Sequence, residues 1–389
     1  MKKVMPPPVA IVGGSVLPAA DAELLRGTVL VRDGRIQAVG SDVPVPPDAE
    51  LIDAAGMWVV PGFVEPHAHA GVHEESSGEA GEDTNETSAP DMAGIRALDG
   101  INVEDPAFSQ ALLGGVTTTV IKPGSSNPFG GQAVAIKTAG GPTVDSRVLR
   151  DAVAVKSAFG ENPKAAHGIQ GRTPVTRMGT AYAVRQALVN ARRAASTDED
   201  QPDLHMAALA RLLAGELAWD VHVHRHDDIA TAMRIAEEFE LRLVINHGTE
   251  SYKLLDEIAA RGIPVVLGPL FSARSKVELA GARWSTAALL HDAGIEVALT
   301  TDHPEVPLHL LVQEAAFAMR EGLPREVALR SITSAPASIY GLGDRVGSLT
   351  AGADADIVLW SADPFDAQSH VEKVLVDGAL VYDRSAAQA

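Results

Sequence analysis

The sequence has 389 residues, of which 46% are hydrophobic and 21% are charged, so it predicts a folded globular protein and excludes a disordered one. Its net charge of −19, from 32 Lys and Arg against 51 Asp and Glu, disfavours nucleic acid and anionic membrane surfaces as partners. There is no cysteine, so any metal must be held by His, Asp, Glu or a modified Lys.

The two ends of the chain alternate short β-type runs with turn signals. Residues 1–60 contain VAIVGGSVL, GTVLVRDGRIQAVG and ELIDAAGMWVV, and residues 345–389 contain ADIVLWSA and VEKVLVDGALVYD. Asp33-Gly34 and Asp377-Gly378 each separate two such runs, which is typical of a tight hairpin turn. We therefore predict one small β domain assembled from both termini.

The middle of the chain, residues 61–344, alternates buried-strand patterns with helical patterns. Residues 227–240, for example, carry an apolar face at helical spacing. Alternation of this kind favours a parallel sheet with crossover helices, and about eight strands are the number that a (β/α)8 barrel needs. The candidate strands are VVPGFVEPH, GVTTTVIKPG, QAVAIKTAG, AVAVKSAFG, AWDVHVH, VINHG, PVVLGP and VALTTDH.

Two histidines, His67 and His69, lie at the end of the first of these strands. With one residue between them, both side chains point to the same side of a strand and can reach one ion. The alternative is a pair of partly exposed histidines with no shared role. That alternative is weakened because other candidate strands end in the same residue types. These residues are His222 and His224 after AWDV, His247 after LVIN, and Asp302 after VALTT.

A metal held by imidazole and carboxylate groups, without thiolate, is typical of a catalytic site for Zn²⁺ or a related divalent ion. Water bound to such an ion becomes a nucleophile near neutral pH. Asp302 can contact the metal, take the proton of that water and pass it to a leaving group. The residues therefore favour hydrolysis of a polar unsaturated bond.

These segments together resemble the amidohydrolase superfamily, and within it the imidazolonepropionase-like branch. The resemblance runs from the split β domain through PGFVEPHAH, GGVTTTVIKPG and HRHDDI to GSLTAGADADIVLW. It implies a (β/α)8 TIM-like barrel over residues 61–344 and a small β-sandwich built from residues 1–60 and 345–389. It also implies the metal ligands His67, His69, His222, His247 and Asp302, with Asp302 as general base and His247 as a second catalytic residue.

Two ligand positions have alternatives. We favour His222 on the fifth strand because it directly follows WDV, and His224 is the alternative. In similar proteins a carboxylated lysine on the fourth strand bridges a second metal, and Lys156 in AVAVKSAFG occupies that place. The alternative role for Lys156 is that of an ordinary salt-bridged lysine. Glu161 is an alternative direct ligand. Glu65 stands where many relatives carry Asp, and we expect its carboxylate to lie outside the set of direct metal ligands.

Segments that leave the same end of the strands are candidates for substrate binding. Residues 71–94 follow the first strand and carry His73 and Glu74 close to the ligands. The Gly-rich residues 123–132 offer backbone amides and the Gln132 side chain, and they lack the pattern of a phosphate-binding loop. Arg225, after the fifth strand, is expected to anchor an anionic group of the substrate.

The sequence therefore predicts a metal-dependent amidohydrolase that cleaves the C–N bond of an amide or cyclic amide in a small molecule. A deaminase of an aminated heterocycle is the alternative, and a catalytically inactive assembly protein is a third reading that the intact ligand positions disfavour. We expect one or two zinc ions, a small-molecule substrate, and no nucleic-acid or membrane partner. Because no window has the roughly 18 apolar residues of a membrane span, we expect a cytoplasmic protein. A homo-oligomer is possible, and the sequence does not decide whether one forms.

Overall fold

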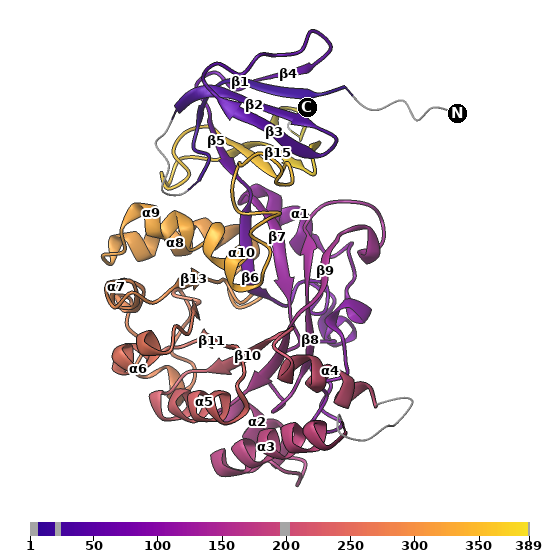
Figure 1. Ribbon diagram of the computed structural model, residues 1–389, viewed down its shortest axis with the longest axis vertical. Helices are drawn as coiled ribbons and strands as arrows, with labels where there is room; N and C mark the ends of the chain where they lie inside the picture. The colour runs from indigo at the N-terminus through magenta and orange to yellow at the C-terminus, as the bar shows by residue number, and fades with distance from the viewer. Residues whose placement is uncertain (1–6, 20–24, 195–202, 388–389) are drawn as a thin grey trace.

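Two eight-stranded sheets organise the chain in the computed structural model, which describes residues 7–19, 25–194 and 203–387 (Figure 1). One sheet forms a small domain at one end of the molecule. The other sheet curves into a nearly closed barrel that carries most of the helices on its outside (Figure 1). This architecture confirms the predicted fold class.

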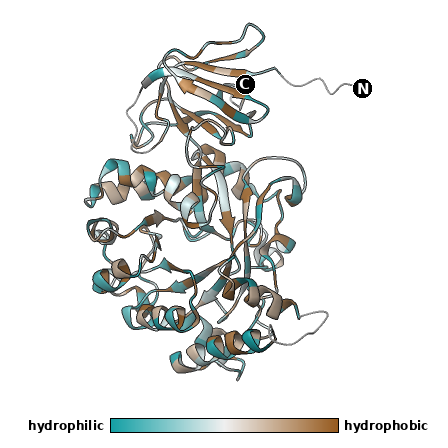
Figure 2. Ribbon diagram, viewed as in Figure 1, coloured by the Kyte–Doolittle hydropathy of each residue, from teal (hydrophilic) through white to brown (hydrophobic). Residues whose placement is uncertain are grey.

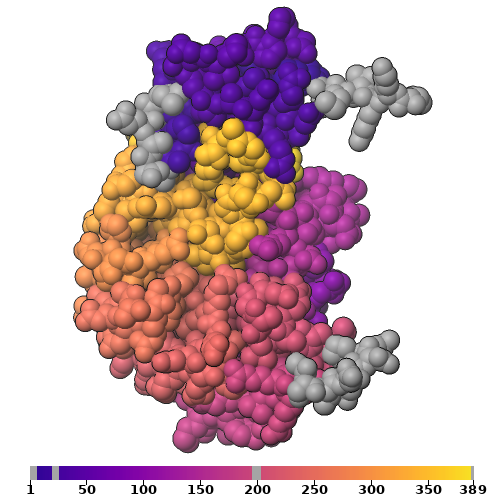
Figure 3. Space-filling view, in the orientation of Figure 1, coloured from indigo at the N-terminus to yellow at the C-terminus, as the bar shows by residue number. Residues whose placement is uncertain are grey.

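The small sheet combines strands from both ends of the chain, in the order β16-β15-β14-β5-β1-β2-β3. β1 pairs with β2 on one edge and with β4 and then β5 on the other, so it belongs to both halves of the domain. Figure 3 shows the N-terminal segment in indigo beside the C-terminal segment in yellow at this end of the molecule. The strands are β1 (Val9–Val16), β2 (Leu25–Arg32), β3 (Arg35–Gly40), β4 (Glu50–Asp53), β5 (Trp58–Pro61), β14 (Ile357–Trp360), β15 (Val371–Val376) and β16 (Ala379–Asp383).

Both predicted hairpin turns are present in this domain. Asp33 and Gly34 connect β2 to β3 with φ values of 53° and 76°, and Asp377 and Gly378 connect β15 to β16 with φ values of 48° and 75°. Positive φ at both central residues defines the turn type whose twist matches that of paired strands. Asp and Gly adopt this backbone at low cost, which explains why the sequence signal was reliable.

The barrel sheet runs in chain order from β6 to β13, and an isolated bridge between Ala68 and His303 joins its two edges. Most of its strands are buried along their lengths, as expected for a barrel covered by helices, and the strand over residues 148–158 is buried after its first four residues. The carboxyl ends of the parallel strands meet at one face. The strands are β6 (Phe63–Ala68), β7 (Val116–Ile121), β8 (Gly131–Lys137), β9 (Val148–Ala158), β10 (Ala218–Val223), β11 (Leu243–His247), β12 (Val265–Leu267) and β13 (Val297–Leu299).

The expectation of a wholly parallel barrel is wrong at one strand. β8 is antiparallel to both of its neighbours, β7 and β9, whereas the other barrel pairs are parallel. A parallel crossover needs a connection of about a dozen residues or more, usually a helix. Residues 122–130 and 138–147 are shorter than that and contain no α-helix, so the chain reverses direction at each.

Helices cover the outside of the barrel, and hydrophobic and hydrophilic residues alternate along their ribbons (Figure 2). The predicted helix over residues 227–240 is α5, whose side chains Ile229, Ala232, Met233, Ala236 and Phe239 are all buried. No helix among the described residues is long and apolar enough to span a bilayer. The helices are α1 (Pro106–Leu113), α2 (Glu161–Gly168), α3 (Arg177–Ala194), α4 (Leu204–Leu213), α5 (His226–Phe239), α6 (Leu255–Ala260), α7 (Thr286–Asp292), α8 (Leu311–Arg320), α9 (Arg325–Arg330), α10 (Ser334–Ile339) and α11 (Arg384–Ala387).

Candidate active site

Three of the predicted ligands converge at the carboxyl ends of β6 and β13. His67 lies in β6, His69 follows it, and Asp302 lies three residues after β13. Asp302 Oδ1 is 3.2 Å from His67 Nε2 and 3.5 Å from His69 Nε2. Two atoms bound at about 2.0–2.1 Å to one tetrahedral ion are about 3.3 Å apart. The three side chains therefore form a cluster that can hold a divalent metal ion.

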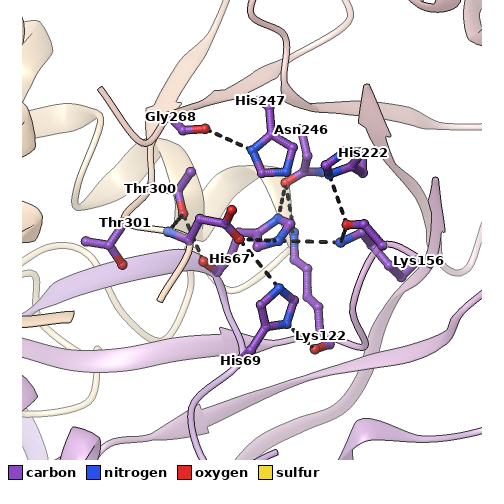
Figure 4. A network of polar contacts seen from close by, with 12 residues as sticks. His67, His69, Lys122, Lys156, His222, Asn246, His247, Gly268, Thr300 and Thr301 are labelled. Atoms are coloured by element: carbon purple, nitrogen blue, oxygen red, sulfur yellow. Dashed lines mark hydrogen bonds and ion pairs between the residues drawn. The ribbon is translucent and has the colours of Figure 1, made fainter. Parts of the chain in front are cut away.

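The ring orientation of three histidines supports metal binding (Figure 4). In each ring Nδ1 faces an oxygen that can only accept a hydrogen bond, so the proton resides on Nδ1 and the Nε2 lone pair is free. The three bonds are His67 to Asn246 Oδ1 at 2.7 Å, His69 to the Lys122 carbonyl at 2.8 Å, and His247 to the Gly268 carbonyl at 2.9 Å.

These free lone pairs need a positive partner. His67 Nε2 and His69 Nε2 face a carboxylate oxygen, an arrangement that is repulsive unless a cation lies between them. His247 Nε2 is buried and has no hydrogen-bond partner among the described residues. Burial lowers the pKa of His67 to about 3 and that of His247 to about 3, so both rings are in the neutral form that ligates metals. The donor set therefore fits a divalent cation.

The fifth-strand histidines lie beside this cluster rather than within it. The ring centroid of His222 is 4.4 Å from that of His247, and the His224 centroid is 4.9 Å from the same ring. His222 Nε2 contacts Asn162 Nδ2 at 3.2 Å, and His224 Nδ1 bonds to Thr249 Oγ1 at 2.7 Å. Both histidines are buried close to His247, so the geometry keeps both as possible ligands.

Lys156, the predicted bridging lysine, points into the same site from β9. Its Nζ is fully buried and lies 3.4 Å from His67 Nε2 and 3.3 Å from Ser125 Oγ (Figure 4). No described carboxylate lies within ion-pair distance of it, and burial lowers the pKa of Lys156 to about 8. The alternative ligand Glu161 begins α2 and lies outside the compact cluster.

A second buried lysine, Lys122, belongs to a network beneath the site that the sequence reasoning missed. Its Nζ donates to Asp220 Oδ2 at 2.6 Å, Tyr340 Oη at 2.7 Å and Asn246 Oδ1 at 3.1 Å. Asp220 also accepts from Tyr340 Oη and Asn246 Nδ2, each at 2.6 Å. The available signal was a polar residue within each of two apolar strand runs, Asp220 in AWDV and Asn246 in LVINH.

Glu65 ties the two strands of the metal cluster together. Its Oε1 accepts bonds from His67 N at 2.9 Å and Thr300 Oγ1 at 2.6 Å. Its Oε2 accepts from the amide and the hydroxyl of Thr301, at 2.9 and 2.7 Å. Burial raises the pKa of Glu65 to about 7. The carboxyl group thus holds the segment before Asp302 against β6 and contacts no other predicted ligand.

The four residues expected to bind substrate occupy other positions. His73 pairs with Glu82, and Glu74 accepts a bond of 2.7 Å from Asn102; they line a separate pocket with Pro304.

Gln132 lies on β8 and contacts Arg211 of α4, at 3.5 Å. Arg225 is ion-paired with Asp227 at 2.7 Å, at the start of α5. Neither residue lines the pocket that opens onto the metal cluster. The structure therefore does not bring Gln132 or Arg225 together with the histidines. The His73 amide donates to the His69 carbonyl at 2.8 Å, but the side chains of His73 and Glu74 line the separate pocket.

The pocket that does open onto the cluster lies between the histidines and the long segment after β12. His222, His224, His247 and Asp302 form one side of it. Residues 267–286 supply much of the other side, and they include three basic side chains. Sequence reasoning missed this segment because it lacks a periodic pattern or a recognisable motif.

Comparison with known proteins agrees with this geometry. The model of the Amidohydrolase family matches residues 169–382. The crystal structure of an amidohydrolase from Thermotoga maritima is 42% identical, covers 97% of this chain and 100% of that one, and superposes with a TM-score of 0.93. The family model spans the second half of the barrel, β10 to β13, and the C-terminal strands of the β domain, whereas the Thermotoga maritima structure covers both domains.

Curated relatives point the same way. Amidohydrolase tasK from Hapsidospora irregularis is 34% identical over 92% of this chain. The aligned region makes up 40% of the length of that protein. An imidazolonepropionase from Acidiphilium cryptum is 29% identical, with 87% of this chain and 88% of the relative covered. Dihydroorotases are also among the relatives.

Proposed function

The chain belongs to the Amidohydrolase family, and from that premise we propose that it is a metal-dependent hydrolase of a C–N bond in a small-molecule amide or cyclic amide. The observation that carries the proposal is the convergence of His67 Nε2, His69 Nε2 and Asp302 Oδ1, with both Nδ1 atoms already engaged elsewhere. The net charge of −19 supports a small molecule, rather than a polyanion, as substrate.

The proposed metal is zinc, because the available donors are imidazole and carboxylate and the chain has no thiolate. His67, His69 and Asp302 would hold it, and His247 with His222 or His224 would complete the site on the other side. A bound ion supplies Lewis-acid chemistry, which polarises a carbonyl group and favours the ionised form of a water.

Asp302 is the proposed general base. Its carboxylate lies at the centre of the cluster, next to the histidines and on the wall of the pocket. It would accept one proton as a water oxygen bonds to the carbonyl carbon, and donate that proton to the nitrogen as the C–N bond breaks. The products are a carboxylic acid and an amine, so atoms and protons balance. His247, whose Nδ1 donates to the Gly268 carbonyl, directs its Nε2 lone pair into the same space and would act there as a metal ligand beside Asp302.

Lys156 is proposed to be carboxylated and to bridge a second ion. The two buried lysines differ in a way that supports this role. Lys122 is neutralised by Asp220 at 2.6 Å, whereas Lys156 has a histidine nitrogen at 3.4 Å and no described carboxylate in ion-pair reach. The Lys156 ammonium would first lose a proton to solvent. The neutral amine would then add to carbon dioxide and release a second proton, so that an anionic oxygen ligand among imidazoles replaces an uncompensated buried cation.

The test is a substrate screen with protein stripped of metal and then reloaded with Zn²⁺ or Mn²⁺. The screen covers amides, lactams, hydantoins, N-acyl amino acids and aminated heterocycles. We expect metal-dependent formation of one carboxylate and one amine per bond cleaved. Ammonia release from an aminated heterocycle, without a new carboxylate, would instead establish the deaminase. No bound metal and no gain in rate on metal addition would contradict both.

A further inference from the structure

The pocket next to the metal cluster carries a group of cations that the proposed reaction does not use. Arg274, Lys276 and Arg283 line it, together with the carboxylates Asp302 and Glu305. Asp302 is already directed toward His67 and His69. Three cations therefore face a single uncommitted carboxylate in this pocket, although the chain as a whole has a net charge of −19.

None of the three cations is neutralised by a described residue. Arg274 donates one bond to the Ala282 carbonyl at 2.9 Å, and the Arg283 guanidinium lies 4.1 Å from the centre of the Tyr252 ring. No described Asp or Glu lies within 4.0 Å of either guanidinium or of Lys276 Nζ. Their hydrogen-bond donors remain largely available to an anion from solution.

Lys276 links this cationic group to the metal cluster. Its Nζ donates to Asn162 Oδ1 at 3.2 Å, and Asn162 Nδ2 is 3.2 Å from His222 Nε2. One amide side chain therefore separates the cation from a candidate metal ligand. The positive charge of Lys276 is also close enough to contribute to the low pKa of His222, after burial and the neighbouring histidines.

Part of the remaining wall of the pocket is apolar. Leu270, Leu279 and Trp284 line it, and Trp284 is 55% exposed, with its ring packed edge-on against Phe317 at 5.4 Å. A large aromatic ring that is half-exposed in a concave site is suited to cover an apolar part of a ligand. The pocket thus combines an apolar wall with a cationic group, next to the expected site of bond cleavage.

We propose that the substrate carries a carboxylate, bound by Arg274, Arg283 and Lys276, on an apolar body that packs against Trp284. Guanidinium groups bind carboxylates through two parallel hydrogen bonds, which fixes both the position and the orientation of the substrate. This inference rests on the proposed hydrolase function, because it assigns the part of the substrate that is not cleaved.

The test measures binding of a matched pair of probes, N-benzoylglycine and N-benzoylglycinamide, by titration calorimetry. The two differ only in whether the end group is a carboxylate or a neutral amide. The full chain is used after metal removal with a chelator, so that the carboxylate has no metal to bind. The variant is Arg274→Gln with Arg283→Gln, and the control is Arg234→Gln with Arg330→Gln, which removes the same charge from the exposed faces of α5 and α9.

The unaltered chain and the control should bind the carboxylate about tenfold or more tightly than the amide, and the pocket variant should lose that preference. Arg274→Lys with Arg283→Lys should retain part of it, which separates lost charge from lost folding. Equal binding of the two probes by the unaltered chain, no binding of the carboxylate, or an unchanged preference in the pocket variant would overturn the inference. These outcomes are independent of metal-dependent turnover, so they are distinguishable from failure of the proposed function.

Discussion

Asn246 accepts the Nδ1 proton of His67 at 2.7 Å, and Asp220 determines which end of the Asn246 amide faces the histidine. Asn246 Nδ2 donates to Asp220 Oδ1 at 2.6 Å, so Oδ1 must point to His67. Lys122 donates to that same oxygen at 3.1 Å. The Asp220 carboxylate, which acts on His67 through Asn246, thus fixes the tautomer of His67 and leaves Nε2 as the metal-binding atom.

The variant Asn246→Ala should therefore weaken metal binding about 10–100-fold, because the loss of such a partner frees the ring and its tautomer. Competition with a chromophoric chelator measures the affinity. The control is Asn127→Ala, which removes a similar buried amide bonded at 2.8 Å to His167, a histidine outside the cluster. Equal metal affinities for the two variants would contradict the role of Asn246.

Asp302→Asn should lower the turnover of a confirmed substrate by about 10²–10⁴-fold, the usual contribution of a general acid–base group. The fold should persist, since the amide keeps the shape of the carboxylate; circular dichroism checks this. Asp344→Asn, on an exposed loop, is the control and should keep full activity. His67→Ala should also abolish activity, through loss of metal. Near-normal turnover by Asp302→Asn would remove the general-base assignment.

Lys156 should give a carbamate signal in the ¹³C NMR spectrum of metal-loaded protein equilibrated with ¹³C-bicarbonate. The reason is that its amine is buried beside His67 without a carboxylate partner. Lys156→Met should lack the signal, whereas Lys164→Met, which replaces a partly exposed lysine of α2, should retain it. A protein that binds metal fully but shows no carbamate would refute the bridging role.

Glu314 of α8 provides a test of electrostatics away from the metal cluster. It is buried and accepts bonds from the amides of Leu270 and Phe271, and burial raises its pKa to about 7 from an ordinary 4.5. The folded state therefore holds a proton that the unfolded state loses as the pH rises above 4.5. The stability that this proton provides is present below pH 4.5 and is lost as the pH rises through about 7.

Glu314→Gln should make the free energy of unfolding fall less between pH 4.5 and pH 8 than it does in the unaltered chain. The expected difference is on the order of a few kcal/mol. Urea unfolding of metal-free protein at several pH values measures it, and Glu326→Gln, an exposed residue of α9, is the control. An unchanged pH dependence in Glu314→Gln would show that the buried carboxyl group is not protonated.

Much of the fold was predictable because the deciding signals are local. The Asp-Gly turns, the apolar face of α5 and the polar residues at strand ends each depend on a few consecutive residues. The direction of β8 was not predictable in this way, because a buried strand reads the same in a parallel or an antiparallel sheet. Its direction follows from the lengths of the two connections, which become meaningful only when the strand bounds are known.

The candidate site likewise combines residues that the sequence could group with residues that only the folded barrel brings together. His67 and His69 lie two residues apart, and the sequence could group them, whereas Lys122, Asp220 and Tyr340 meet only through the closed barrel. A further signal became visible in the backbone. His247 and Asp302 both have positive φ, 68° and 51°, a conformation that costs energy in residues other than glycine and clusters at functional sites.

The most direct measurement of the central claim is a crystal structure of the full chain grown with Zn²⁺, with anomalous data collected on both sides of the zinc edge. We predict a zinc peak about 2.0–2.1 Å from His67 Nε2 and His69 Nε2, with Asp302 as a further ligand. A peak at a different place, or none at these residues in crystals that contain zinc, would contradict the assignment of this cluster as the metal site.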